Sequence, residues 1–165
     1  MHKLIVMGVA GSGKSTLALH IATALGCTLV EGDDYHLPQS QDKMRRGIAL
    51  EDSDREPWLD RLGELMAEQT GSVVLTCSAL KRRYRDRLRA TVAGLQFVFI
   101  DIPQAQAADR LRSRPAHLFP HTLVASQFQA LESPIGEVGV LAVAASKPTA
   151  GQVEAVLRWL ETAEG

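Results

Sequence analysis

Apolar residues occur along this chain in five short, continuous runs. The runs span residues 4–7, 28–30, 73–77, 97–100 and 138–144. Runs of this length and composition predict strands that are buried on both faces of a sheet. Between them, apolar residues return every three or four positions, which predicts helices with one buried side. Strands that alternate with helices are typical of a parallel sheet covered on both faces. The pattern therefore predicts a three-layer α/β fold with a five-stranded parallel sheet.

The helices that this period predicts span residues 14–25, 54–70, 81–89, 104–112, 121–131 and 151–160. Asp54 is the expected N-cap of the second helix, and Pro57 would lie in its first turn, where no backbone donor is missed. Residues 33–52 are polar and are broken by Pro38 and Gly47, so we expect a loop and a short helix there. A mobile loop is expected over residues 114–120.

Length and composition narrow the class of protein. The 165 residues fit one domain, and a chain with 45% hydrophobic and 22% charged residues is not disordered as a whole. The near balance of 18 basic and 19 acidic residues argues against a dedicated nucleic-acid binder. No apolar run could cross a bilayer, and the apolar start is too short for a signal peptide. Cys27 and Cys77 lack a metal-type spacing, so a reduced, cytoplasmic setting is expected.

The segment GVAGSGKS at residues 8–15 fits the P-loop pattern, with a buried strand before it and a helix after it. Its glycines allow successive backbone N–H groups to face one concavity, which can hold phosphate oxygens. Lys14 can reach the outer phosphates, and the Ser15 hydroxyl can bind Mg²⁺. A glycine-rich turn without a ligand would not explain this lysine and this hydroxyl. The candidate ATP-binding residues are Gly8, Val9, Ala10, Gly11, Ser12, Gly13, Lys14, Ser15 and Thr16.

An acidic pair follows the second predicted strand. Asp33 and Asp34 come at the carboxyl end of that strand, and in a parallel sheet these ends face the ligand crevice. One of the two could accept a proton from a substrate hydroxyl or orient it. A solvated acidic loop is the alternative, and the position favours the functional interpretation. Glu51 and Asp52, further along, are interpreted as solvated loop acids.

The third predicted strand ends in Thr76 and Cys77, without the acid that usually supplies a second magnesium contact. This departs from the motor and switch types of P-loop protein. We therefore expect Mg²⁺ to be held by Ser15, phosphates and water, with Glu31 or Asp33 acting through water.

Two basic clusters follow later strands. Lys81, Arg82 and Arg83 begin the helix predicted after the third strand, where cations oppose the helix dipole. Arg110 and Arg114 lie four residues apart, and would share a face if their helix continues that far. Each cluster could bind an anion, such as a substrate carboxylate or a transferred phosphoryl group, or could be an ordinary solvated face. The pattern leaves both interpretations open.

These segments, in this order, resemble the gluconate kinase (gluconokinase) family of small P-loop kinases, which is related to the shikimate and adenylate kinases. Besides the P-loop, the resemblance includes GDDYH at 32–36, DSDREPWL at 52–59, CSALKRRYRDRLR at 77–89, RLRSRPAHLF at 110–119 and SQFQALESP at 126–134. It implies the P-loop NTPase fold of the nucleoside-monophosphate and shikimate kinases. It also implies one domain over residues 1–165, with an acceptor-binding insert at about 33–70 and a mobile lid at about 113–125.

The resemblance implies ATP-dependent phosphorylation of D-gluconate to 6-phospho-D-gluconate, with ATP and Mg²⁺. The implied catalytic residues are Lys14, Asp33 at the acceptor hydroxyl, and Arg114 on the transferred phosphoryl group. Ser15 would be the metal ligand and Arg110 would lie near ATP. Residues 146–148 would lie by the adenine. The candidates for gluconate binding are Asp33, His36, Arg55, Lys81, Arg85 and Gln127.

The implied partner is a small sugar acid, without nucleic acid or membrane. A homodimer is implied by the family and by no sequence pattern. Departures from the family pattern are Ala10, Glu31, Ser40 and Ala49, where Ser, Asp, Asn and Pro are common. Two other functions stay open. One is a kinase of this fold for shikimate or another metabolite, and the other is a non-catalytic ATP-binding regulatory protein.

Overall fold

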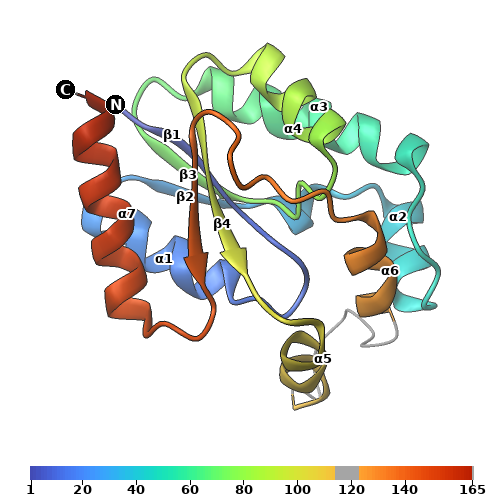
Figure 1. Ribbon diagram of the computed structural model, residues 1–165. Coiled ribbons are helices and arrows are strands. Elements are labelled where there is room, and N and C mark those ends of the chain that lie inside the picture. Colours follow the sequence, from blue (N-terminus) through green and yellow to red (C-terminus); the bar gives the residue numbers. More distant parts are fainter. Residues whose placement is uncertain (114–122, 165) are drawn as a thin grey trace.

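The computed structural model describes residues 1–113 and 123–164, which form a sheet between two layers of helices (Figure 1). In these residues the sheet has five parallel strands in the order β2-β3-β1-β4-β5. They are β1 (Lys3–Met7), β2 (Thr28–Glu31), β3 (Val73–Thr76), β4 (Leu95–Asp101) and β5 (Val140–Ala144). The predicted five-stranded parallel sheet is confirmed, and each predicted run overlaps one of these strands.

The central strand β1 shows why the runs are continuously apolar. Leu4 and Val6 lie in one hydrophobic core, and Ile5 and Met7 lie in the other. Because β1 is hydrogen-bonded between β3 and β4, with helices over both faces, all of its residues are buried. A strand in this position has no solvent face, so it cannot alternate between apolar and polar residues.

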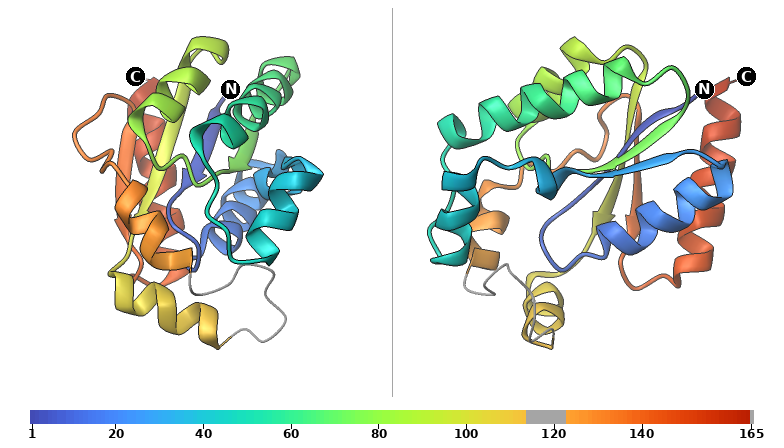
Figure 2. Two further views of the ribbon diagram at one scale, coloured as in Figure 1. Left: turned by 90° about the vertical axis from the view of Figure 1, so that its right-hand side faces the viewer. Right: turned by 180° about the vertical axis from the view of Figure 1, so that it is seen from behind.

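The helices cover the two faces of the sheet (Figure 2). Apolar side chains of α1 (Lys14–Leu25), α5 (Gln104–Arg112), α6 (Val124–Ala130) and α7 (Thr149–Glu164) lie in the first core. Those of α3 (Asp52–Glu68) and α4 (Arg82–Thr91) lie in the second. The short 3-10 helix η1 (Gly32–Tyr35) and α2 (Pro38–Arg45) follow β2. None of the helices in the described part of the chain is long and apolar enough to cross a bilayer.

Helix α3 begins earlier than predicted, which corrects the expected N-cap. Glu51 is the N-cap, and Asp54 lies at the third helical position, where its carboxylate accepts a 2.8 Å hydrogen bond from Glu51 N. The Glu51 side chain accepts one from Asp54 N in return, a reciprocal capping box. Pro57 therefore lies inside the helix, beyond the first turn, where its ring removes one backbone hydrogen bond. Glutamate is not a preferred N-cap residue, so the sequence pattern pointed to Asp54 instead.

The strand order creates a crevice at the carboxyl ends of β1 and β3. The chain leaves β1 toward β2 at one edge, and it leaves β3 toward β4 on the opposite side of β1. In open parallel sheets, ligands bind where neighbouring connections diverge in this way. The predicted mobile loop, and most of the predicted lid with Arg114, lie outside the described residues.

Candidate active site

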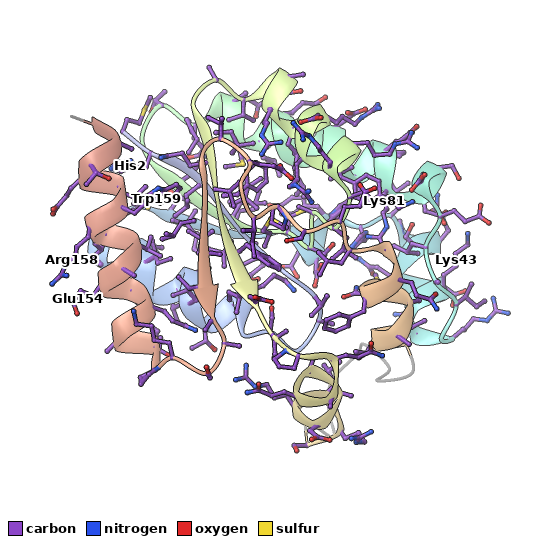
Figure 3. All side chains as sticks on the ribbon, in the orientation of Figure 1. His2, Lys43, Lys81, Glu154, Arg158 and Trp159 are labelled. Atoms are coloured by element: carbon purple, nitrogen blue, oxygen red, sulfur yellow. The ribbon has the colours of Figure 1, made fainter. Side chains whose placement is uncertain are left out.

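A cavity of about 300 Å³ opens at the carboxyl ends of β1, β2 and β3. Its walls come from the P-loop, from the segments that follow β2 and β3, and from α3 and α6. Figure 3 shows Lys81, one of the lining residues, on the side of the molecule away from α7. The predicted site residues that line this cavity are Ala10, Gly11, Gly13, Lys14, Ser15, Thr16, Asp33, His36, Arg55, Lys81 and Gln127.

The P-loop joins β1 to α1 through left-handed backbone conformations at Gly11 (φ 81°) and Gly13 (φ 96°). A Cβ on Gly11 would lie 2.7 Å from the carbonyl oxygen of Ala107 on α5, so only glycine allows this close approach. Gly13 is the N-cap of α1, and no side chain of the described residues caps the helix there. The first N–H groups of α1 are therefore available to an anion, which the helix dipole also attracts.

Lys14 lies between the P-loop and the acceptor side of the cavity. Its Nζ donates hydrogen bonds of 3.0 Å to the carbonyl oxygens of Gly8 and Val9. Burial lowers the pKa of Lys14, and the nearby carboxylates of Asp33 and Glu31 oppose this effect without cancelling it. The ammonium group is thus close both to the loop that would bind phosphates and to the acids after β2.

Ser15, Glu31 and Thr76 form a hydrogen-bonded chain from α1 to β3. Ser15 Oγ donates to Glu31 Oε2 at 3.0 Å, and Thr76 Oγ1 donates to the same oxygen at 2.7 Å. Thr76 Oγ1 also accepts a 3.1 Å hydrogen bond from Gly32 N, which fixes the direction of its own proton. At this place β3 contributes the hydroxyl group of Thr76, and the carboxylate comes from Glu31 on the neighbouring strand β2.

Asp33, on η1, presents its carboxylate to the cavity, and its side chain is 78% exposed. Partial loss of solvation raises the pKa of Asp33, but the contact with His36 and the charges of Lys14 and Arg55 lower it more. The net result is a pKa below the ordinary value of the carboxyl group. Asp33 is therefore ionised at neutral pH and can accept a hydrogen bond from a hydroxyl group.

His36 is buried beside Asp33. His36 Nε2 lies 3.6 Å from Asp33 Oδ1. The imidazole ring stacks on the indole of Trp58, with ring centroids 3.9 Å apart. Trp58 Nε1 donates a 2.8 Å hydrogen bond to the carbonyl oxygen of Gly32, at the start of η1. The turn that carries Asp33 is thus anchored to α3 at two points.

Arg55 is a cation in the cavity wall, and no carboxylate of the described residues lies within ion-pair distance of it. The residue is 9% exposed, and its guanidinium lies 5.7 Å from the centroid of the Tyr84 ring. Among the residues that the structure describes, no carboxylate pairs with it and no group accepts a hydrogen bond from it. Its charge acts on the carboxylates of Asp33 and Asp54 from beyond ion-pair distance. A guanidinium in this position is suited to a carboxylate of a ligand, which it can bind through two hydrogen bonds.

Asp52 is a cavity residue that the sequence analysis missed. The interpretation as a solvated loop acid is wrong, since its carboxylate accepts a 2.9 Å hydrogen bond from Lys81 Nζ and another from the Tyr84 hydroxyl. These hydrogen bonds, that of Tyr84 first, lower the pKa of Asp52. A signal was available, because Asp52 and Arg55 are three residues apart and so share a face of α3.

The basic cluster at the start of α4 contains one residue that faces the cavity and two that lie on the solvated surface. Lys81 lines the cavity. Arg83 is exposed and pairs with Asp52 at 3.0 Å and with Glu56 at 3.4 Å on α3. Arg82 is exposed as well, 3.7 Å from Asp86. Acids of the protein therefore offset the two arginines, which form an ordinary surface, and only Lys81 faces the site.

Gln127 and Arg110 both contact the P-loop. Gln127 is buried, and its Oε1 accepts a 2.7 Å hydrogen bond from Ala10 N. Arg110 Nη1 donates to the carbonyl oxygen of Ser12 at 3.2 Å, and Nη2 donates to that of Ala145 at 3.3 Å. Arg110 thereby joins the P-loop to the segment after β5.

A second, more open hollow of about 530 Å³ adjoins the first. Its walls include Arg110, Lys147 and Gln152, so it lies beside residues 146–148. Gly13 and Thr16 line both hollows. Two hollows that meet at a P-loop can place a nucleotide in one and a phosphoryl acceptor in the other.

Arg85 is not brought to the cavity, which corrects the expectation that it contacts the acceptor. Its side chain is fully buried and pairs with Glu137, with Nη2 2.6 Å from Oε2. The remaining N–H groups donate to carbonyl oxygens, so none is left for a ligand. Arg114 lies outside the described residues, and its role stays a prediction.

A P-loop that borders a cavity with the Asp33 carboxylate and the Arg55 guanidinium, and a second hollow on its nucleotide side, is the arrangement of a P-loop kinase of small molecules. The profile of a family described as AAA domain matches residues 4–134. A gluconokinase of Gluconobacter oxydans is 42% identical over 158 residues, which cover 94% of this chain and 89% of that protein. The crystal structure of a gluconokinase from Sinorhizobium meliloti is 43% identical, with a TM-score of 0.89 over 98% of this chain and 92% of that one.

The chain belongs to the gluconokinase family. A shikimate kinase from Aquifex aeolicus superposes with a TM-score of 0.64 over 98% of each chain, at 20% identity. This similarity shows the shared fold alone, and it confirms the predicted shikimate kinase-like architecture.

Proposed function

We propose that this protein transfers the γ-phosphoryl group of ATP to the 6-hydroxyl of D-gluconate, giving ADP and 6-phospho-D-gluconate. The observation that carries the proposal is the unpaired guanidinium of Arg55 in the same cavity as the ionised Asp33. Gluconate has a carboxylate for the first group and a primary hydroxyl for the second. The names of the relatives, which are gluconokinases, support this substrate.

In this reaction the P-loop side would bind ATP and the acceptor side would bind gluconate. Lys14 and the N–H groups at the start of α1 bind the outer phosphates of ATP, with Arg110 and residues 146–148 on the nucleotide side. Asp33 orients the 6-hydroxyl for in-line attack and accepts its proton. Arg55 and Lys81 bind the carboxylate and neighbouring hydroxyls. Arg114, on the proposed lid at about 113–125, neutralises charge on the transferred group.

His36 and Gln127 complete the acceptor site in this proposal. His36 holds Asp33 in place and faces the cavity, while Gln127 keeps the P-loop against the acceptor side. The acceptor-binding insert would be residues 33–70 approximately, since Asp33 lies on η1, His36 directly follows η1, and Arg55 lies on α3.

The residues around Ser15 fit a magnesium ion. Ser15 Oγ donates its proton to Glu31, so its lone pairs are free to face a cation, and a carboxylate stands within reach of the metal's water shell. Oxygen ligands of this kind are the ones that Mg²⁺ prefers. When bound, Mg²⁺ would neutralise charge on the phosphate oxygens.

A coupled assay with ATP and a panel of acceptors tests the proposal. We expect ADP release that depends on gluconate, and phosphate on O6 of the product by NMR. Lys14→Met serves as a control for contaminating kinases, since it should fold but lose transfer. Turnover of shikimate without turnover of gluconate would replace the substrate. Nucleotide binding without acceptor-dependent ADP release would indicate a regulatory protein instead.

Two further properties implied by the family belong to the proposal, a homodimer and a cytoplasmic setting. Light scattering on the purified protein tests the first, and a mass of one chain at micromolar concentration would contradict it. Fractionation of the cells that produce the protein tests the second.

A further inference from the structure

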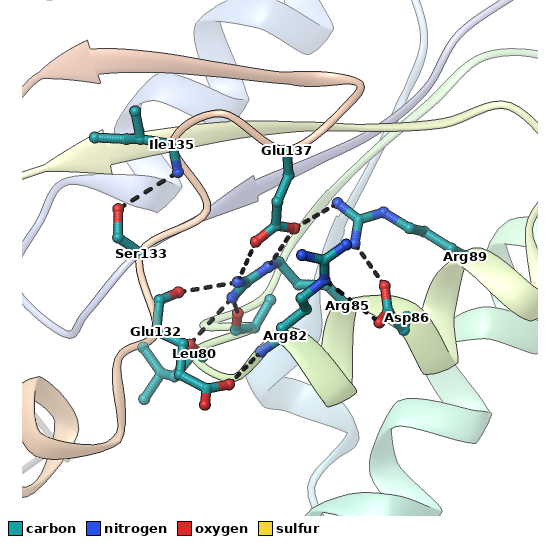
Figure 4. A network of polar contacts seen from close by, with 10 residues as sticks. Leu80, Arg82, Arg85, Asp86, Arg89, Glu132, Ser133, Ile135 and Glu137 are labelled. Carbon is teal, nitrogen blue, oxygen red and sulfur yellow. Dashed lines mark hydrogen bonds and ion pairs between the residues drawn. The ribbon is translucent and has the colours of Figure 1, made fainter.

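Arg85 and Glu137 form a buried ion pair next to the acceptor cavity (Figure 4). The Arg85 side chain is 0% exposed and that of Glu137 is 8% exposed. Arg85 Nε and Nη2 donate to the two oxygens of Glu137 at 3.1 and 2.6 Å, which is the bidentate geometry that guanidinium and carboxylate groups prefer. Arg89 Nη2 adds a 2.8 Å contact to Glu137 Oε1. Glu137 is thus the common acceptor for two arginines of α4.

The other N–H groups of Arg85 hold the loop of residues 77–81 between β3 and α4. Arg85 Nη1 donates to the carbonyl oxygens of Ala79 and Leu80 at 2.8 and 3.1 Å. Ala79 has a φ of 46°, the one non-glycine residue with positive φ in the described part of the chain. A conformation that alanine disfavours persists only where its surroundings hold it. The same loop carries Ser78 and Lys81, which line the acceptor cavity.

The pair also joins this loop to the segment of residues 131–139 that follows α6. Arg85 Nη2 donates to the carbonyl oxygen of Glu132 at 2.9 Å. Glu132 N donates to the Leu80 carbonyl at 2.8 Å, and Glu132 Oε1 accepts from Arg82 N at 2.7 Å. Helix α6, which precedes this segment, carries Gln127 against the P-loop, so Arg85 links two parts of the chain that line the cavity.

We propose that Glu137 is a positioning residue of the acceptor site. By fixing Arg85, it sets the conformation of residues 77–81 and so the place at which Ser78 and Lys81 meet the acceptor. This role rests on the proposed function. Glu137 is not among the residues that line the acceptor cavity, and its carboxylate accepts hydrogen bonds from Arg85 and Arg89.

The charge of Glu137 matters as well as its shape. Hydrogen bonds from Arg85 and Arg89 lower the pKa of Glu137 more than its burial raises it, so the group is ionised at neutral pH. A glutamine at this position would turn its amide N–H group toward an N–H group of Arg85, so one of the two hydrogen bonds from Arg85 would be lost. An aspartate would keep the charge, but its carboxylate would be withdrawn by one methylene.

Steady-state kinetics of E137D and E137Q test the proposal. We expect KM for gluconate to rise in E137D and further in E137Q, to about tenfold above wild type, with a much smaller change in KM for ATP. A purely structural role would lower the melting temperature in the same order and leave KM for gluconate unchanged. The matched control is D60N, which breaks an exposed two-pronged pair with Arg87 between α3 and α4, away from this loop.

A double variant, R85M/E137M, separates positioning from stability. Replacing both members avoids leaving one charge buried alone, although the carbonyl oxygens of Ala79, Leu80 and Glu132 lose their donor. KM for gluconate should rise because the loop is no longer held, while the melting temperature should fall less than in E137Q, which leaves Arg85 without its charged partner. Folded Glu137 variants with the wild-type KM would overturn the role of Glu137. Absence of gluconate turnover by the wild type would instead contradict the proposed function.

Discussion

Ser15 at the start of α1 and Glu31 at the end of β2 share a hydrogen bond of 3.0 Å between Oγ and Oε2. Thr76 donates to the same carboxylate oxygen, so Glu31 accepts hydrogen bonds from one hydroxyl group on α1 and one on β3. A hydroxyl that gives its proton to a carboxylate turns its lone pairs away from it. The acid that β3 lacks is thus supplied from the neighbouring strand.

Glu31→Gln should weaken the use of Mg²⁺. The amide can no longer accept from both hydroxyls with a full negative charge, so the concentration of Mg²⁺ that gives half-maximal activity should rise about tenfold. Titration of activity with Mg²⁺ at saturating ATP measures the change. Asp34→Asn is the matched control, because Asp34 is an exposed acid on the same turn. An equal shift in both variants would mean that only the local field changed.

Asp33→Asn should abolish most of the transfer without preventing ATP binding. The amide cannot accept the proton of the acceptor hydroxyl, so kcat should fall by about a hundredfold or more, while KM for ATP changes little. Burst and steady-state assays with gluconate measure this loss. Strong ATP hydrolysis by Asp33→Ala, with transfer lost, would show that Asp33 positions the acceptor and is not the base.

The same carboxylate predicts the pH dependence of the reaction. The pKa of Asp33 lies below 3.8, so activity that needs its ionised form should persist into mildly acidic solution and fall only as pH drops through this lowered value. His36→Phe keeps the stacking on Trp58 but removes the contact that lowers the pKa, so the acidic limb of kcat/KM should move to higher pH. An unchanged limb would assign it to another group.

Arg55→Met should raise KM for gluconate by roughly thirtyfold, since a hydrogen bond to a charged group contributes about 2 kcal/mol. A neutral polyol without the carboxylate separates charge recognition from general damage, because wild type and variant should turn it over equally poorly. Arg87→Met, at an exposed arginine paired with Asp60, is the control for lost surface charge. Equal KM values for gluconate in wild type and Arg55→Met would show that Arg55 does not bind the gluconate carboxylate, and would contradict the argument on which the proposed function rests.

The parts of the fold that could be predicted are those that depend on neighbouring residues in the sequence. A strand buried on both faces needs a continuous apolar run, so β1 and β3 were visible as such. The P-loop is equally local, because Gly13, Lys14 and Ser15 act from adjacent positions. The start of α3 was misplaced because its cap depends on a reciprocal contact between Glu51 and Asp54 rather than on one preferred residue.

The acceptor site was harder to predict, because its partners are distant in the sequence. Lys81 and Arg85 are one helical turn apart, and nothing local says that the first faces the cavity and the second the interior. The difference comes from Asp52, 29 residues before Lys81, and from Glu137, 52 residues after Arg85. Only the packing of α3 and of the segment after α6 against α4 decides which cation meets which acid.

Asp54→Asn should destabilise the protein at neutral pH and less so in acid. Asp54 accepts hydrogen bonds from Glu51 N at 2.8 Å and from Lys43 Nζ at 2.9 Å, which hold its pKa below the ordinary 3.8. A group whose folded pKa is lowered stabilises the fold above its unfolded pKa, and this contribution is lost as pH falls through the folded pKa. The free energy of unfolding should therefore drop by about 1 kcal/mol at neutral pH, the usual scale of one lost intramolecular hydrogen bond. The difference from wild type should shrink as the carboxyl group is protonated.

Urea unfolding at neutral and at strongly acidic pH measures both values, with Ser53→Ala as the neighbouring control. A difference that stays constant with pH would show that the charge of Asp54 contributes nothing to the cap.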